Sequence, residues 1–132
     1  SLDWEKAHGK EQTLFFGKLA IENFPNWFSE YVKNNKMSVC DFGCALGQIT
    51  HLLSLHFPDS HIVGQDISNY AINAAKELFP KLNFTSQDLF KSLDKYDIIF
   101  SSNTLEHFYE PHDIIDKLSD HAENFLVFLL PF

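Results

Sequence analysis

The sequence contains little that would suit a secreted or membrane-spanning protein. Its 132 residues include only two cysteines, Cys40 and Cys44, too few and too close together to frame a disulfide-stabilised secreted domain. No apolar run approaches the roughly 20 residues that a membrane span requires, and the first residues lack the charged and apolar regions of a signal peptide. We therefore expect a cytoplasmic protein, in a reducing setting, without a membrane partner.

Positive charge is also scarce. Ten Lys plus Arg stand against 18 Asp plus Glu, which gives a formal net charge of -8 at pH 7. The basic residues are scattered singly, so no local patch offsets a field that repels polyphosphates. We therefore expect no nucleic-acid partner.

Hydrophobic residues, in contrast, are plentiful. They make up 45% of the chain and include 14 phenylalanines, enough to bury a core. A chain of 132 residues also matches the usual size of one domain. The sequence therefore predicts a single domain over residues 1–132, with an N-terminal helical cap at 1–36 and an α/β core at 37–132.

Short β-rich apolar runs alternate with amphipathic helical stretches, as in parallel sheets with crossover helices. The runs predict five strands, at residues 37–42, 61–67, 83–87, 96–101 and 125–130. Helical spacing predicts three crossover helices, marked by Ile49 to Phe57, by Ala71 to Leu78 after a cap at Ser68 or Asn69, and by Ile114, Ile115, Leu118 and Ala122.

Two helical stretches, around residues 11–20 and after Pro25, precede the first strand. The right-handed crossover rule then predicts an open, doubly wound, mainly parallel sheet with helices on both faces. We expect it to be Rossmann-like, with the strand order 3-2-1-4-5. Ligands bind such sheets at the carboxyl ends of the strands.

The most informative segment is the loop after the first predicted strand, Asp41-Phe42-Gly43-Cys44-Ala45-Leu46-Gly47. Gly43 and Gly47 allow a sharp turn and a close approach of the backbone to a ligand. Asp66 follows Gly47 by 19 residues, at the end of the second strand. Its carboxylate could accept hydrogen bonds from ribose hydroxyls. Alternatively, it is a favourable charge before the next helix.

A dinucleotide-binding dehydrogenase shares the strand, loop, helix and distal acid. Its fingerprint, G-x-G-x-x-G, would fall on Gly43, Ala45 and Gln48, so the third glycine is missing. An oxidoreductase that uses NAD is therefore disfavoured.

The loop closely resembles the first motif of class I methyltransferases that depend on S-adenosylmethionine (SAM), an acid followed by G-x-G-x-G. Asp41, Gly43 and Gly47 are in register, and Ala45 replaces the middle glycine. The resemblance implies that Gly43, Cys44 and Ala45 line the methionine and ribose part of SAM. It also implies that Asp66 holds the ribose hydroxyls while Ile67 packs on the adenine.

The same resemblance extends to two later segments. Gln87-Asp88-Leu89 looks like the segment that reads the adenine edge, with Asp88 accepting from the exocyclic amine and the Leu89 amide donating to a ring nitrogen. Asp88 could alternatively be a turn residue. Residues 96–108 resemble the fourth motif in its Leu-Glu-His version, common among small-molecule methyltransferases. This places Ser102 and Asn103 beside the methionine moiety and the acceptor.

The expected reaction is transfer of the SAM methyl group to a small-molecule acceptor, which leaves S-adenosylhomocysteine. Enzymes promote such a displacement mainly by positioning, and a base is needed only if the acceptor must lose a proton. His107 is the candidate base, although it could equally orient its loop. The alternative is a SAM-binding module, or a fragment, without a complete acceptor site.

Two further expectations concern metals and partners. His51, His56 and His61 recur five residues apart, which does not stack side chains on one helical face, so we expect no metal site. The antiparallel C-terminal hairpin of the superfamily is missing from this sequence, which suggests a fragment of a longer methyltransferase. An exposed fifth-strand edge then predicts self-association.

Overall fold

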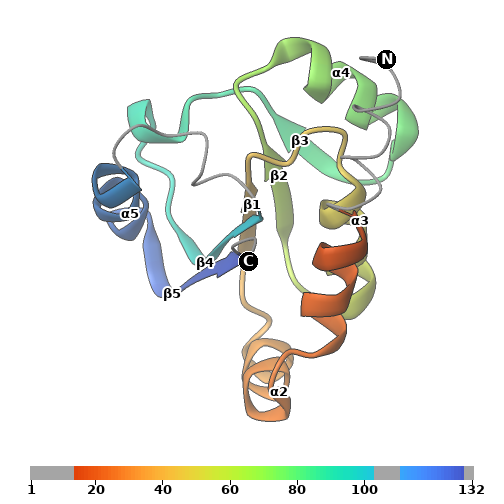
Figure 1. The fold of residues 1–132 in the computed structure, drawn as a ribbon, viewed down its shortest axis with the longest axis vertical. Helices are drawn as coiled ribbons and strands as arrows, with labels where there is room; N and C mark the ends of the chain where they lie inside the picture. The colour runs from red at the N-terminus through yellow and green to blue at the C-terminus, as the bar shows by residue number, and fades with distance from the viewer. Residues whose placement is uncertain (1–13, 103–110, 130–132) are drawn as a thin grey trace.

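The computed structural model describes residues 14–102 and 111–129, which form a central sheet between helices (Figure 1). Residues 14–22 are helical. The elements that follow are α2 (Asn26–Asn35), β1 (Val39–Phe42), α3 (Gln48–His56), β2 (Ile62–Gln65), α4 (Asn69–Leu78), β3 (Asn83–Thr85), the 3-10 helix η1 (Leu89–Lys91), β4 (Tyr96–Ser102), α5 (Pro111–Ser119) and β5 (Ala122–Leu129).

The five strands form one parallel sheet of order β3-β2-β1-β4-β5. The order of the strands and their parallel direction confirm the Rossmann-like prediction. Since β1 lies between β2 and β4, the chain winds outward in both directions from β1. The crevice expected of such a fold therefore lies at the carboxyl ends of these strands.

Side chains of the central strands alternate between two cores, which explains why helices cover both faces. Val39, Ile98 and Phe100 pack with residues of α2 and α3, whereas Cys40 and Ile99 face the other side and pack with α5. Figure 1 shows α3 and α5 on opposite sides of the sheet. The prediction of helices on both faces is confirmed, and the burial of both faces explains the continuous apolar runs.

A third cluster joins α4 to the sheet through Phe84 of β3, which packs with Cys44, Ile72 and Ala75. The Phe84 ring lies against Gly64 of β2, where an added Cβ would come within 2.6 Å of its Cδ1 atom. The absence of a side chain at Gly64 therefore makes room for the ring.

The helix α4 begins as the sequence predicts. Ser68 is its N-cap, and its hydroxyl accepts a hydrogen bond from the Ala71 amide at 3.2 Å. Of the two predicted capping residues, Ser68 caps the helix and Asn69 is its first residue.

Several predicted boundaries are wrong. The second and third strands are shorter than predicted, since β2 is Ile62–Gln65 rather than 61–67 and β3 is Asn83–Thr85 rather than 83–87. Two further residues belong to other elements than predicted. Ala122, predicted on the last helix, is the first residue of β5, because α5 ends at Ser119 in a tight turn and the sheet pairs Ala122 with Tyr96. Met37, predicted in the first strand, precedes β1. The helix α2 ends at Asn35, its C-cap Lys36 is in a left-handed conformation, and the Met37 amide still bonds to the Val32 carbonyl.

Within residues 14–102 and 111–129, no helix combines the length and apolar character needed to cross a membrane.

The close packing at Gly64 gives a first prediction. Gly64→Ala should destabilise the chain by about 1–3 kcal/mol, because the new methyl group must displace the Phe84 ring. Urea unfolding measures the loss. A Phe84→Leu background should reduce the penalty, so strictly additive effects of the two substitutions would contradict this account.

Candidate functional site

The carboxyl ends of β1, β2, β3 and β4 meet at one edge of the sheet because all four strands are parallel. The loops that leave these ends carry most of the residues singled out in the sequence. Geometry at this edge therefore decides which of them come together.

The loop after β1 is a tight turn held by its own backbone. Gly43, Ala45 and Gly47 all have positive φ angles, of 75°, 49° and 88°. The amides of Gly43 and Cys44 donate to the Gln65 carbonyl at 2.7 and 2.9 Å. Glycine suits two of these positions because it adopts positive φ without a steric penalty, whereas Ala45 does so under strain.

Gly47 serves packing as well as turning. It is the N-cap of α3, and a Cβ added there would lie 2.7 Å from the Phe84 Cζ atom. The sequence suggests that this glycine lets the backbone approach a ligand. In the structure, the lack of a side chain at Gly47 also makes room for the Phe84 ring, and its approach to a ligand stays a prediction.

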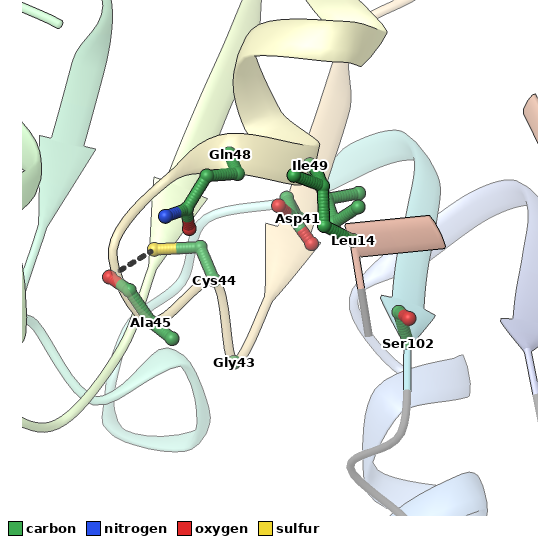
Figure 2. A pocket seen from close by; sticks show the side chains of 8 residues that line it. All are labelled: Leu14, Asp41, Gly43, Cys44, Ala45, Gln48, Ile49 and Ser102. Atoms are coloured by element: carbon green, nitrogen blue, oxygen red, sulfur yellow. Dashed lines mark hydrogen bonds between the residues drawn. The ribbon is translucent and has the colours of Figure 1, made fainter. Parts of the chain in front are cut away.

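A cavity of about 70 Å³ opens beside this loop. Five predicted site residues line it, namely Asp41, Gly43, Cys44, Ala45 and Ser102, together with Leu14, Gln48 and Ile49 (Figure 2). The last three were not identified from the sequence. Gln48 and Ile49 directly follow the recognised motif, whereas Leu14 reaches the cavity only through the packing of its helical segment.

Two side chains of the cavity wall have pKa values above those they have in water. Asp41 is 2% exposed, and its Oδ2 accepts a 2.7 Å hydrogen bond from the Thr50 hydroxyl. Burial raises the pKa of Asp41 to about 7; the Thr50 hydrogen bond opposes this rise and the charge of Asp66 adds to it. Burial also raises the pKa of the Cys44 thiol, which is therefore neutral and contributes size rather than reactivity.

Asp66 connects the ends of β1 and β2. Its Oδ2 accepts from the Ala45 amide at 2.9 Å, and its Oδ1 accepts from the Ser68 amide at 3.0 Å. The carboxylate is thus held in one orientation beside the cavity loop, with further lone pairs left for a ligand. Its neighbour Ile67 is 76% exposed, an unusual position for a large apolar side chain.

The segment after β3 lies next to these residues. The Gln87 carbonyl accepts a 3.0 Å hydrogen bond from the buried Gln65 side chain. Asp88 is the N-cap of η1, and its Oδ1 accepts from the Phe90 amide at 3.0 Å. A turn role of this kind was the alternative prediction for Asp88. The cap uses Oδ1 and not Oδ2. Leu89 is buried.

Other predicted residues are outside the described part of the chain. Asn103 and His107 both belong to residues 103–110, and the predicted helical stretch at 11–20 is described only from residue 14. Within the described ranges, no group of three or more His, Cys, Asp or Glu side chains gathers as a metal site would require.

A family model described as a methyltransferase domain matches residues 33–130. This chain therefore belongs to that methyltransferase domain family. A putative methyltransferase 235L of Invertebrate iridescent virus 6 is 34% identical over 88 residues, which cover 65% of this chain and 32% of the relative. A malonyl-[acyl-carrier protein] O-methyltransferase of Acetivibrio thermocellus is 30% identical over 88 residues, with coverages of 64% and 31%.

Solved methyltransferase structures share the fold. The plantazolicin methyltransferase BpumL in complex with S-adenosylhomocysteine superposes with a TM-score of 0.75 at 24% identity, covering 94% of this chain and 50% of that one. Magnesium protoporphyrin IX methyltransferase from Synechocystis PCC 6803 with bound SAM gives 0.66 at 21% identity, with coverages of 86% and 58%. The chain thus spans about a third of the curated relatives and about half of these solved proteins.

The strained turn at Ala45 yields a second prediction. Ala45→Gly should stabilise the chain by about 0.5–1 kcal/mol, because glycine adopts a φ of 49° without steric cost. Ala74→Gly, inside α4, is the matched control and should destabilise by about 0.5–1 kcal/mol. Urea unfolding compares the two, and equal destabilisation by both would show that the loop is unstrained.

The buried carboxyl of Asp41 yields a third prediction, which concerns the pH dependence of stability. Because its pKa is higher in the folded chain, at about 7, than in the unfolded chain, the folded state holds the proton more tightly. The free energy of unfolding should therefore fall as the pH rises from about 4, the ordinary aspartate value, to about 7. Asp41→Asn keeps an acceptor for Thr50 and removes this fall.

Urea unfolding of both proteins at pH 5 and pH 8 measures the effect. We take the free energy of unfolding of Asp41→Asn minus that of wild type at each pH. This difference should be about 2–4 kcal/mol larger at pH 8 than at pH 5. Parallel pH profiles of the two proteins would mean that Asp41 titrates normally.

Proposed function

We propose that this chain binds SAM at the carboxyl edge of its sheet and that the protein transfers the SAM methyl group to a small-molecule acceptor. One observation carries the proposal. The Asp66 carboxylate is hydrogen-bonded to the Ala45 amide at 2.9 Å, which joins the ends of β1 and β2 beside the cavity. Membership of the methyltransferase family and the ligands of the solved structures support the choice of SAM.

The ribose of SAM would bind at Asp66. Both of its oxygens are already oriented by backbone amides, so little conformational entropy is lost when they accept hydrogen bonds from two ribose hydroxyls. A reading of Asp66 as a purely structural residue accounts for its turn with Ser68. The second bond of Asp66, to the Ala45 amide, brings the negative charge to the cavity loop, where ribose hydroxyls would bind.

The adenine would lie between Ile67 and the segment after β3. Ile67 is 76% exposed, and a flat base packed on it would remove that apolar surface from water. Asp88 would accept from the exocyclic amine through the oxygen that does not cap η1, and the Leu89 amide would donate to a ring nitrogen. Gln87 leads the chain into this segment.

The methionine part would lie along the cavity lined by Gly43, Cys44, Ala45 and Ser102, with Asn103 beyond it. SAM carries positive charge on its sulfonium and its ammonium groups. Asp41 and Asp66 supply negative charge at this place, and a bound cation would favour the ionised form of Asp41. Negative charge of this kind stabilises the bound sulfonium, so it favours binding of the cofactor rather than the methyl-transfer step itself.

When bound, SAM supplies an electrophilic methyl group, and the protein's task is to position it and to exclude competing acceptors. His107 stays our candidate for a base that removes a proton from the acceptor. A SAM-binding module without turnover would bind the same ligands, so the two functions separate only by the release of S-adenosylhomocysteine from the whole protein in the presence of an acceptor.

Several expectations about setting and partners stay predictions. They are the cytoplasmic location, the lack of a nucleic-acid partner, the division into a helical cap and a core, and self-association. Within the described residues β5 pairs with β4 alone, which is the geometry on which the expected self-association depends.

Calorimetry with SAM, S-adenosylhomocysteine and NAD tests the proposed site. We expect the two adenosyl ligands to bind and NAD not to bind. Asp66→Ala should weaken binding of S-adenosylhomocysteine about 10- to 100-fold, because two charge-assisted hydrogen bonds are lost.

Two further variants separate the ligand from the turn. Asp66→Asn keeps one acceptor for the loop amides and should still weaken binding, whereas Asp59→Ala removes an exposed carboxylate away from the cavity and should leave affinity unchanged. Wild-type affinity in Asp66→Ala, or no binding of either adenosyl ligand to the wild-type protein, would refute the site.

A further inference from the structure

Gln65 is a buried polar side chain in a strand where apolar residues are expected. It is the last residue of β2, it pairs with Phe42 of β1 and Thr85 of β3, and it is only 3% exposed. A primary amide buried without hydrogen bonds is costly, so its presence in a strand buried on both faces calls for a specific partner.

The partners of Gln65 lie on both sides of the proposed adenosyl site. Its backbone carbonyl accepts from the amides of Gly43 and Cys44 at 2.7 and 2.9 Å, which shapes the loop after β1. Its side-chain Nε2 donates to the Gln87 carbonyl at 3.0 Å, which holds the segment after β3. One residue thus connects the two loops that enclose the site.

The bond to Gln87 acts directly before Asp88. The Gln87 amide donates to the Thr85 hydroxyl at 3.1 Å, and its carbonyl is held by Gln65, so the peptide groups on both sides of Gln87 are fixed. Asp88 then starts η1 through its bond to the Phe90 amide. The position of the Asp88 carboxylate relative to β2 therefore depends on the Gln65 amide.

The length and the chemistry of Gln65 both matter for this contact. Asparagine lacks one methylene and would stop short of the Gln87 carbonyl. Methionine has a similar length and volume but no donor, so it would fill the same space without the hydrogen bond.

We propose that Gln65 is a positioning residue for base selectivity. By holding the Gln87 carbonyl, it keeps Asp88 where it can accept a hydrogen bond from the amine of a 6-aminopurine. The inference rests on the proposed function, and it adds a residue that determines which purine the site prefers.

Two ligands that differ at one position of the base test it. S-adenosylhomocysteine carries an amine at position 6 of the purine, whereas S-inosylhomocysteine carries a carbonyl there and would face the Asp88 carboxylate with an acceptor. Calorimetry on the wild-type chain should show a preference of about 10- to 100-fold for the adenosyl ligand.

Gln65→Met should weaken the binding of S-adenosylhomocysteine about 10-fold and change the binding of S-inosylhomocysteine less than about 2-fold. The preference for the adenosyl ligand should therefore shrink. Gln65→Asn should act in the same direction, and it decides the matter if the methionine variant does not fold. Ile62→Val, a conservative change at the other end of β2, is the control and should keep the wild-type ratio. A general loss of stability weakens both ligands equally and leaves this ratio unchanged.

The failures are distinguishable. If wild type does not bind S-adenosylhomocysteine, the proposed function itself is refuted. If wild type binds it and the Gln65 variants keep the full preference for the adenosyl ligand, the inference about Gln65 is overturned while the proposed function stands. A wild type without any preference between the two ligands overturns the inference as well.

Discussion

The candidate site depends on a turn whose two amides share one carbonyl acceptor. The amides of Gly43 and Cys44 both point to the Gln65 carbonyl at the end of β2, so the loop after β1 cannot move without the neighbouring strand. This turn needs positive φ at Gly43, Ala45 and Gly47. It leads directly into α3, whose N-cap Gly47 packs against the Phe84 ring. A local backbone constraint and the packing of β3 therefore act on the same few residues.

The polar groups around this turn form a chain of contacts rather than separate sites. Asp66 holds the Ala45 amide, and the Gln65 side chain holds the Gln87 carbonyl. Asp41 lies beneath the loop, buried and bonded to Thr50. These contacts keep two acidic side chains, Asp41 and Asp66, close to the small cavity.

The arrangement also explains how one short segment can pack against the core and line the cavity at once. Gly47 leaves room for Phe84, while Gly43 and Ala45 expose backbone at the cavity. The cost of Ala45 in a left-handed conformation is small compared with the packing of the cluster around Phe84, so the loop tolerates it. The neutral thiol of Cys44 fills space between these two regions.

The linear sequence by itself determined the order of the strands and the placement of Gly43 and Asp66 directly after β1 and β2. It did not determine the place of Asp88, which lies three residues beyond β3 as the N-cap of η1. Hydrophobic periodicity, glycine and capping residues are local signals, and Ser68 shows how well they mark a helix start. Contacts between distant segments were decided only by the tertiary structure. The bond from Gln65 to Gln87, the approach of Leu14 to the cavity and the transfer of Ala122 from helix to strand all require a partner brought near by folding. No local pattern records such a partner, because a hydrogen bond across the sheet depends on strand order and register rather than on neighbours in sequence.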